Sequence, residues 1–151
     1  MKNSDIEALH DYAQLERMVL SMPMAKTLGL QFTRTSRGQV ELEIPVLEAF
    51  TFRPGQLQAT AVFAIADFAA VAAAGTMLDP GWINATIDAT LKLVAPAKGV
   101  ALRARGQVID AGRMLTVCAA NVYAVTASGE ETLCATLLGT ARNIDMNPQK
   151  N

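Results

Sequence analysis

The chain of 151 residues contains one histidine and two cysteines, and these scarcities exclude several classes of enzyme. His10 lies near the N-terminus, so the middle of the chain has no base for Ser-His-Asp or Cys-His catalysis. Cys118 and Cys134 lack the spacing of metal ligands, and we expect both to be small buried hydrophobic side chains. Because the N-terminus also lacks the basic-then-apolar layout of a secretory signal, we expect a reduced, cytoplasmic protein.

Charge is scarce as well. Only 18% of the residues are charged, the net charge is −1, and the basic side chains are scattered along the chain. No basic stripe is present, so we expect no nucleic-acid partner. The motifs GxSxG and GxGxxG and the P-loop are absent. Because 51% of the residues are hydrophobic, the composition predicts one globular domain with a substantial core.

The longest apolar stretch is QATAVFAIADFAAVAAAGTML, residues 58–78, and it contains one carboxylate, Asp67. It consists mainly of alanine, which contributes little to membrane insertion, and a central Asp costs about 2.5–3.5 kcal/mol on insertion scales. Apart from Trp82, neither flank carries the usual interfacial anchors. We therefore expect no membrane span but a helix that is enclosed by other structure.

The rest of the chain predicts what encloses this helix. Ser4–Glu7 has the pattern of a capping box for a short amphipathic helix that ends before Pro23. Pro45 cannot donate to a sheet ladder, so we place it at a strand end or on an edge strand. Alternation of apolar and polar residues predicts six strands, at residues 28–35, 39–46, 82–94, 100–109, 114–126 and 132–144. In the strand that follows the long helix, one face is predicted to carry Ile83, Ala85, Ile87, Ala89, Leu91 and Leu93.

This order of elements predicts an α+β protein in which a six-stranded antiparallel sheet wraps around one long central helix, with a short N-terminal helix. It is the order of the hotdog fold. We expect an N-terminal helix and linker, then the hotdog domain, then a flexible tail, at residues 1–24, 25–144 and 145–151.

Two segments resemble the phenylacetic-acid-degradation-type (PaaI-like) family of hotdog-fold acyl-CoA thioesterases. RPGQLQATAVFAIAD is similar to the family segment in which a His-Gly-Gly turn opens the central helix and an acid follows. TIDATLKLVAPAKG is similar to the strand that comes after this helix. The spacing matches at both places without a gap, and the resemblance covers roughly residues 25–142.

The resemblance implies roles for four side chains. Asp67 falls on the acid that acts as general base or nucleophile toward the thioester. Thr86 falls on a Ser or Thr that hydrogen-bonds near the acid and the water. Gln58 stands where the family usually has His, and Phe52 where many members have an Asn that helps to hold the water.

Elementary chemistry gives a partly independent argument for the start of the helix. Thioester hydrolysis needs a base for water and donors for the developing oxyanion. The first amides of a helix are free and lie at the positive end of its dipole, so the N–H groups of Ala59 and Thr60 are candidate donors. The Gln58 amide is a further donor, although it does not become cationic; alternatively, Gln58 is an N-terminal cap or a solvated loop residue.

The spacing of these groups predicts an oligomer. Gln58 and Asp67 are nine residues apart, which is roughly 13 Å along a helix, so one chain does not bring both to the same carbonyl. A two-fold dimer does so if the helix start of one subunit meets the middle of the other helix. We predict a homodimer at minimum, with a homotetramer built as a dimer of dimers as the larger option.

Substrate contacts are predicted around the same helix. Phe63 and Val71 align with Asp67 on one face and border a narrow apolar slot for an acyl or aryl chain, although core packing explains them equally well. Phe52 and Arg53 lie close to the helix start, where Arg53 is within reach of the pantetheine or a phosphate of coenzyme A.

Further basic residues are weaker candidates for phosphate contacts. Lys98 lies in the loop before a strand, and Arg103 and Arg105 alternate on one face of that strand. These side chains either form a basic rim for the phosphates of coenzyme A or belong to a solvated strand face.

Two functions therefore remain open. The first is an acyl-CoA thioesterase that uses Asp67 as its acid. The second is a non-catalytic hotdog domain that binds acyl-CoA or a similar acyl ligand, in which Asp67 is a structural carboxylate satisfied by Thr86 or by backbone amides. We expect no metal and no cofactor, since coenzyme A is part of the substrate.

Overall fold

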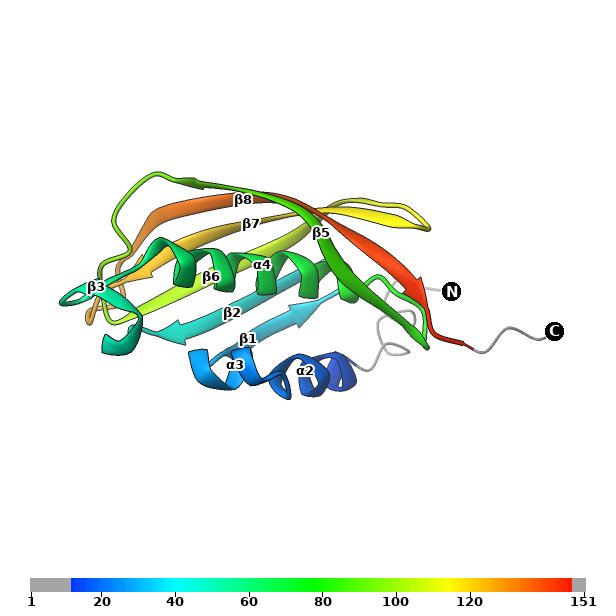
Figure 1. Cartoon of the computed structure of the whole chain (residues 1–151), viewed down its shortest axis with the longest axis horizontal. Coiled ribbons are helices and arrows are strands. Elements are labelled where there is room, and N and C mark those ends of the chain that lie inside the picture. Colours follow the sequence, from blue (N-terminus) through cyan, green and yellow to red (C-terminus); the bar gives the residue numbers. More distant parts are fainter. Residues whose placement is uncertain (1–11, 148–151) are drawn as a thin grey trace.

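A six-stranded antiparallel sheet curves around one long helix, α4, in the computed structural model, which describes residues 12–147 (Figure 1). The strand order is β1-β2-β6-β7-β8-β5. This arrangement confirms the predicted α+β class and the hotdog architecture. The predicted capping box at Ser4–Glu7 and the single His10 lie outside the described residues. The predicted domain boundaries stay predictions.

The elements agree with the predicted strands, whose ends differ by three residues at most. Pro45 is the last residue of β2, as predicted. In chain order the elements are α2 Tyr12–Leu20, α3 Pro23–Leu28, β1 Gln31–Ser36, β2 Gln39–Pro45, the 3-10 helix η1 Glu48–Phe50, β3 Thr51–Arg53, β4 Gln56–Leu57, α4 Ala59–Gly75, β5 Trp82–Leu93, β6 Ala101–Ala111, β7 Leu115–Val125 and β8 Glu131–Asp145.

Helix α3 has no counterpart in the prediction, which has a linker and the start of a strand there. Pro23 opens the helix at a position where its missing N–H costs nothing. Gly29 ends it with φ 70°, a left-handed conformation that favours glycine, and donates its N–H to the carbonyl of Lys26. For this reason the first strand begins at Gln31 and not at Leu28.

Helix α4 packs directly on the sheet because small residues face it. Ten of its 17 residues are buried, and eight of those ten are alanines. On β6, Gly106 touches the helix backbone so closely that a Cβ atom there would lie 2.0 Å from the carbonyl oxygen of Ala69. The prediction of an enclosed helix is therefore confirmed. Within residues 12–147, no helix is long and apolar enough to cross a membrane.

A β-bulge in β5 changes which of its side chains face α4. Thr86 pairs with the buried Ala141 of β8, and the register shifts at the next residue. Because directly opposed residues of an antiparallel pair share a face, Thr86 and the preceding Asn84 point toward α4. The predicted single face is therefore wrong before the bulge, where Ile83 and Ala85 lie on the opposite side of the strand.

Candidate active site

Asp67 is half-buried on the side of α4 that faces β5. Its Oδ1 accepts a hydrogen bond from Thr86 Oγ1 at 2.8 Å. One helical turn further along, Asn84 Nδ2 donates to the carbonyl oxygen of Val71 at 3.0 Å. Both contacts depend on the bulge, which turns these two strand residues inward. The sequence prediction missed Asn84, although its place two residues before Thr86 on the same strand is the signal that identifies it.

The electrostatic surroundings of Asp67 favour a base. Burial raises the pKa of its carboxyl above the ordinary value, and the hydrogen bond from Thr86 offsets part of this rise. Among residues 12–147, no ion pair includes Asp67. A half-buried carboxylate with a raised pKa and no cation beside it is a stronger base than an ordinary aspartate, which suits it to accept a proton from water.

Both cysteines are buried and free, as predicted. Burial, and secondarily the negative charge of Asp67, raise the pKa of the Cys118 thiol to about 11. Burial is also the main cause that raises the pKa of Cys134 to about 11. Both side chains therefore stay neutral thiols at physiological pH.

Helix α4 begins at Ala59, and Gln58 is its N-cap residue. The Gln58 side chain is exposed and makes no capping hydrogen bond, so Gln58 occupies the predicted N-terminal cap position without capping the helix through its side chain. No non-glycine residue within residues 12–147 has a positive φ, so Ala59 and Thr60 begin the helix without the conformations that require glycine. Both are exposed, and the first amides of a helix have no intrahelical acceptor.

Two flanking segments hold this helix start in place. The N–H of Leu57, a buried residue, donates to the carbonyl of Ala97 at 3.0 Å. The N–H of Gln58 donates to the carbonyl of Phe50 at 2.9 Å. The backbone that precedes the candidate oxyanion donors is thus fixed on both sides, which preorganises their N–H groups.

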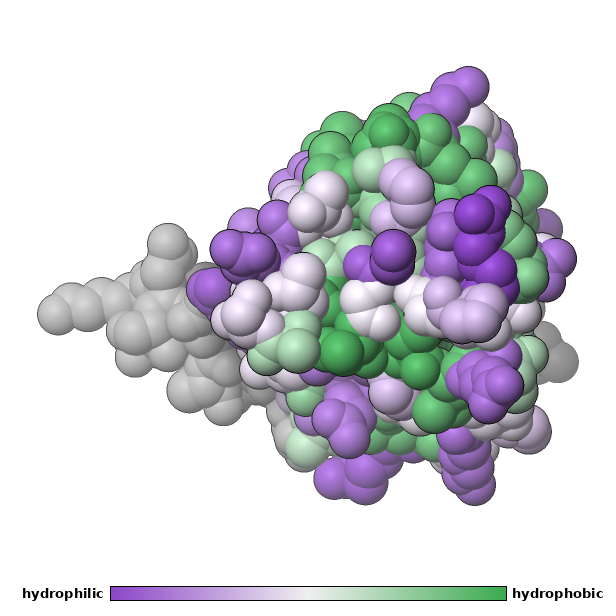
Figure 2. All heavy atoms as spheres, turned by 90° about the vertical axis from the view of Figure 1, so that its left-hand side faces the viewer, coloured by the Kyte–Doolittle hydropathy of each residue, from purple (hydrophilic) through white to green (hydrophobic). Residues whose placement is uncertain are grey.

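The β3–β4 hairpin carries Phe52 and Arg53, two of the predicted substrate contacts. Phe52 is 53% exposed, and the Arg53 guanidinium lies over its ring, 4.8 Å from the centroid. Gln56 forms a β-bridge with the exposed Lys98. Arg53, Lys98 and the start of α4 therefore lie at one end of the molecule, where charged side chains are set among apolar ones (Figure 2).

Within one chain the two halves of the predicted site do not meet. Asp67 lies nine residues beyond Gln58, which is roughly 13 Å along α4. Phe63, 38% exposed, lies one turn before Asp67, and the half-buried Val71 lies one turn after it. The predicted slot residues thus flank the acid, whereas the candidate oxyanion donors are separated from it.

Arg103 and Arg105 are held by carboxylates on the outer face of the sheet. Arg105 Nε lies 2.8 Å from Glu41, and Arg103 Nη2 lies 2.9 Å from Glu43. Glu131, at the start of β8, accepts hydrogen bonds from both guanidinium groups. The cluster favours the predicted strand face over the predicted phosphate rim.

A six-stranded sheet wrapped around one long helix, with a half-buried acid on that helix, is the architecture of the hotdog fold. The chain belongs to the thioesterase family. It is similar to a thioesterase family protein from Silicibacter pomeroyi, with 32% identity and a TM-score of 0.84 over 89% of this chain and 99% of that chain. The predicted thioester hydrolase is thereby confirmed as the class of enzyme.

Other solved structures share the fold at lower identity. A thioesterase from Haemophilus influenzae is 19% identical with a TM-score of 0.78, over 93% of this chain and 95% of that chain. The PaaI protein from the phenylacetic acid degradation operon of E. coli is 18% identical with a TM-score of 0.76, over 90% and 94%. These likenesses confirm the predicted PaaI-like architecture. No family model matches the chain, and no curated protein does.

Proposed function

We propose that the chain hydrolyses acyl-CoA thioesters to free acid and thiol, with Asp67 as general base. The observation that carries the proposal is the state of this carboxylate: it is half-buried, its pKa is raised, and no ion pair of the described chain compensates it. A partly buried charge without a counter-ion costs stability, and such costs concentrate at functional sites. Thr86 holds Oδ1, which leaves Oδ2 as the proposed acceptor of the proton from water.

In the proposed reaction, Asp67 takes a proton from water as the water oxygen attacks the thioester carbonyl carbon. The N–H groups of Ala59 and Thr60 donate hydrogen bonds to the oxyanion, assisted by the Gln58 side-chain amide. Collapse of the tetrahedral intermediate breaks the C–S bond, and the proton on Asp67 passes to the leaving thiolate. A nucleophilic role of the same carboxylate leaves the requirement for Asp67 unchanged.

The proposal requires a second copy of the chain, because the helix start and Asp67 are far apart within one subunit. Within the described sheet, β5 is an edge strand that pairs with β8 alone, and it carries the 57% exposed Ile87. An unpaired strand edge is a template for pairing with another chain. We propose a homodimer formed across this edge, in which the helix start of each subunit faces Asp67 of the other; a dimer of dimers is the larger assembly consistent with it.

The substrate contacts follow from the same arrangement. Arg53 and Lys98 lie at the helix start and are proposed to contact the phosphates of coenzyme A, with Phe52 beside them. Phe63 and Val71 border the slot for the acyl group next to the acid. Among residues 12–147 no group of three His, Cys, Asp or Glu side chains is placed to hold a metal ion. The cytoplasmic location stays a prediction.

A non-catalytic acyl-CoA-binding domain is the second candidate function, and the helix start favours it. Gln58 offers a neutral amide where the resemblance implies His, and it does not become cationic to stabilise an oxyanion. Phe52 offers no polar group to hold a water molecule. Such a protein would bind the same ligands through the same slot without turning them over.

Release of free thiol from short, long and aromatic acyl-CoAs distinguishes the two functions. We expect wild type to turn over members of this panel and Asp67→Asn to lose about 10²–10⁴-fold in kcat/KM, the range of a general base. Asn keeps the shape of the side chain and still accepts the hydrogen bond from Thr86. Asp110→Asn, at an exposed carboxylate of β6, is the matched control and is expected to retain full activity.

Each other outcome has a clear meaning. Tight binding of acyl-CoA without turnover by wild type and Asp67→Asn alike supports the non-catalytic function. Equal turnover by the two proteins makes Asp67 a structural carboxylate and overturns the proposed mechanism.

A further inference from the structure

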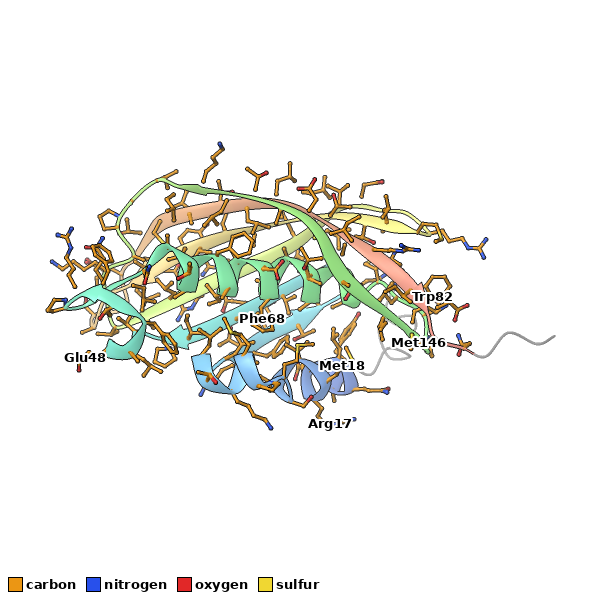
Figure 3. All side chains as sticks on the ribbon, in the orientation of Figure 1. Arg17, Met18, Glu48, Phe68, Trp82 and Met146 are labelled. Atoms are coloured by element: carbon orange, nitrogen blue, oxygen red, sulfur yellow. The ribbon has the colours of Figure 1, made fainter. Side chains whose placement is uncertain are left out.

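A groove of about 490 Å³ lies at the far end of α4 from the helix start. It runs between α2, the end of α4, the start of β5 and the end of β8. Figure 3 shows Met18 on α2 across from Trp82 and Met146 at the ends of the two strands. Its volume falls in the range of small-molecule sites, about 300–1,000 Å³. The residues that matter for the argument are Leu15, Met18, Gly75, Trp82, Asn84 and Met146.

The walls of this groove are mainly apolar and open to solvent. Met18 is 41% exposed, Met146 is 60% exposed, and Trp82 is half-buried. Methionine side chains are flexible and adapt to apolar ligands of varied shape. Asp79 is the one charged residue among the described lining residues. The described part of the lining therefore offers mainly apolar contact and no cation, which matches an uncharged hydrocarbon better than a phosphate or carboxylate.

The groove continues the line of contacts that begins at Asp67. Asp67 and Val71, one helical turn apart on α4, contact Thr86 and Asn84, two residues apart on β5. Gly75 lies one further turn along the helix and lines the groove. The groove thus begins two turns beyond the acid, roughly 12 Å along α4.

Gly75 also sets how closely α2 approaches the end of α4. A Cβ atom at this position would lie 3.0 Å from Leu15 Cδ1, so the glycine allows α2 to approach the end of α4. The half-buried Val71 forms the surface between this point and Asp67. To reach the groove, an acyl chain held at the acid passes Val71 and Asn84, whose hydrogen bond joins α4 to β5.

We propose that this groove receives the distal end of the acyl chain of the thioester substrate, so that the enzyme prefers chains long enough to reach it. The proposal rests on the proposed function, because it places the thioester carbonyl beside Asp67. It assigns the chain-length preference to Met18, Trp82 and Met146, which lie outside the predicted slot.

Filling the groove tests the proposal. Met18→Trp adds bulk at its wall, whereas Met22→Trp introduces the same change at a methionine of similar exposure, 40%, that does not line it. We expect Met18→Trp to lower the ratio of kcat/KM for long-chain over short-chain acyl-CoA about tenfold or more, since one misplaced methylene group already costs about 10–200-fold in an apolar pocket. Met22→Trp is expected to leave the ratio unchanged.

A second measurement does not depend on turnover. Trp82 is the single tryptophan of the chain, and it lines the groove, so its fluorescence reports occupancy directly. In Asp67→Asn, we expect long-chain acyl-CoA to shift the emission of Trp82, and coenzyme A or acetyl-CoA to leave it unchanged.

The outcomes separate this proposal from the proposed function. The groove proposal alone is overturned if turnover depends on Asp67 but Met18→Trp leaves the chain-length ratio unchanged and long-chain acyl-CoA does not shift the emission of Trp82. The same outcome is expected if another segment of protein fills the groove, and it overturns the groove proposal in that case too. Absence of turnover by wild type, together with a response of Trp82 to long chains only, overturns hydrolysis and supports the groove as the acyl site.

Discussion

Among residues 12–147, Thr86 is the one side chain that donates a hydrogen bond to the proposed base, and its effect on the pKa of that base has a definite sign. Asp67 accepts a proton only when it is deprotonated, so kcat/KM falls as the pH is lowered through its pKa. Because burial raises this pKa, the fall occurs above the ordinary range of an aspartate. The hydrogen bond from Thr86 acts in the opposite direction, since it stabilises the charged form.

Thr86→Val is therefore expected to move the acid limb of the pH profile to higher pH. Valine keeps the shape of threonine and removes the donor, so the charged form of Asp67 loses stabilisation while its burial remains. The measurement is kcat/KM for one acyl-CoA as a function of pH. Thr90→Val, at an exposed position beyond the bulge of the same strand, is the control. A limb that stays in place or moves to lower pH would show that Thr86 does not tune the acid.

At the scale of the elements, the packing of α4 on the sheet depends on how closely the helix approaches β6. Gly106 leaves no room for a side chain, because a Cβ atom there would overlap the carbonyl of Ala69. That carbonyl is backbone, so relief requires the whole helix to shift. The approach also sets the height of Asp67 above the sheet, two residues before Ala69 in the chain.

Gly106→Ala is expected to lower the free energy of unfolding by about 2–3 kcal/mol, at the upper end of what overpacking usually costs. Urea unfolding measures this difference. Gln107→Ala is the matched control on the neighbouring, exposed position and is expected to change stability by about 0.5 kcal/mol or less. If Gly106→Ala is as stable as wild type, α4 does not lie as close to β6 as described.

The elements were predictable from the sequence to different degrees. The alanine-rich run is long enough to identify α4, and the alternation of apolar and polar residues extends far enough to identify the long strands. The bulge in β5 is a single inserted residue that leaves the composition of the strand unchanged, so Ile83 and Ala85 were assigned to the wrong face. Helix α3 spans six residues, less than two turns, and too few for a helical period to emerge.

The candidate site shows the same limit. Asp67 was identified because a charge in an apolar run is conspicuous, and Thr86 because the resemblance points to it. The ion pairs of Arg103 and Arg105 join strands about 60 residues apart in the chain, and only the register of the sheet reveals them. The groove beside α2 escaped prediction because its lining comes from three separate segments of the chain.

At the scale of the whole molecule, the sheet has an open edge at β5. The proposed site becomes complete only when two chains assemble. Ile87→Lys places a charge on the exposed edge strand, which is how natural proteins prevent strands from pairing. We expect this variant to dissociate to monomers and to lose activity with the dimer, and to regain activity as its concentration is raised. Sedimentation velocity and thiol release at matched concentrations measure the two effects.

The control for this variant is Ile109→Lys, at an equally exposed isoleucine, 55%, on the interior strand β6. It is expected to remain dimeric and active. An Ile87→Lys protein that is monomeric and fully active would show that one chain contains a complete site. A protein that stays dimeric with the charge in place would move the interface to another face.

The ordinary helical start at Ala59 and Thr60 has a consequence for how this region tolerates change. If the backbone N–H groups stabilise the oxyanion, the side chains at these positions matter little. Activity should then change little across all substitutions at either position. Proline alone removes the N–H, and at position 59 the extended backbone of Gln58 accommodates it. In a scan of all substitutions, activity falls sharply with proline alone. A catalytic side chain gives the opposite result, since activity then survives only with the original residue or a chemically similar one.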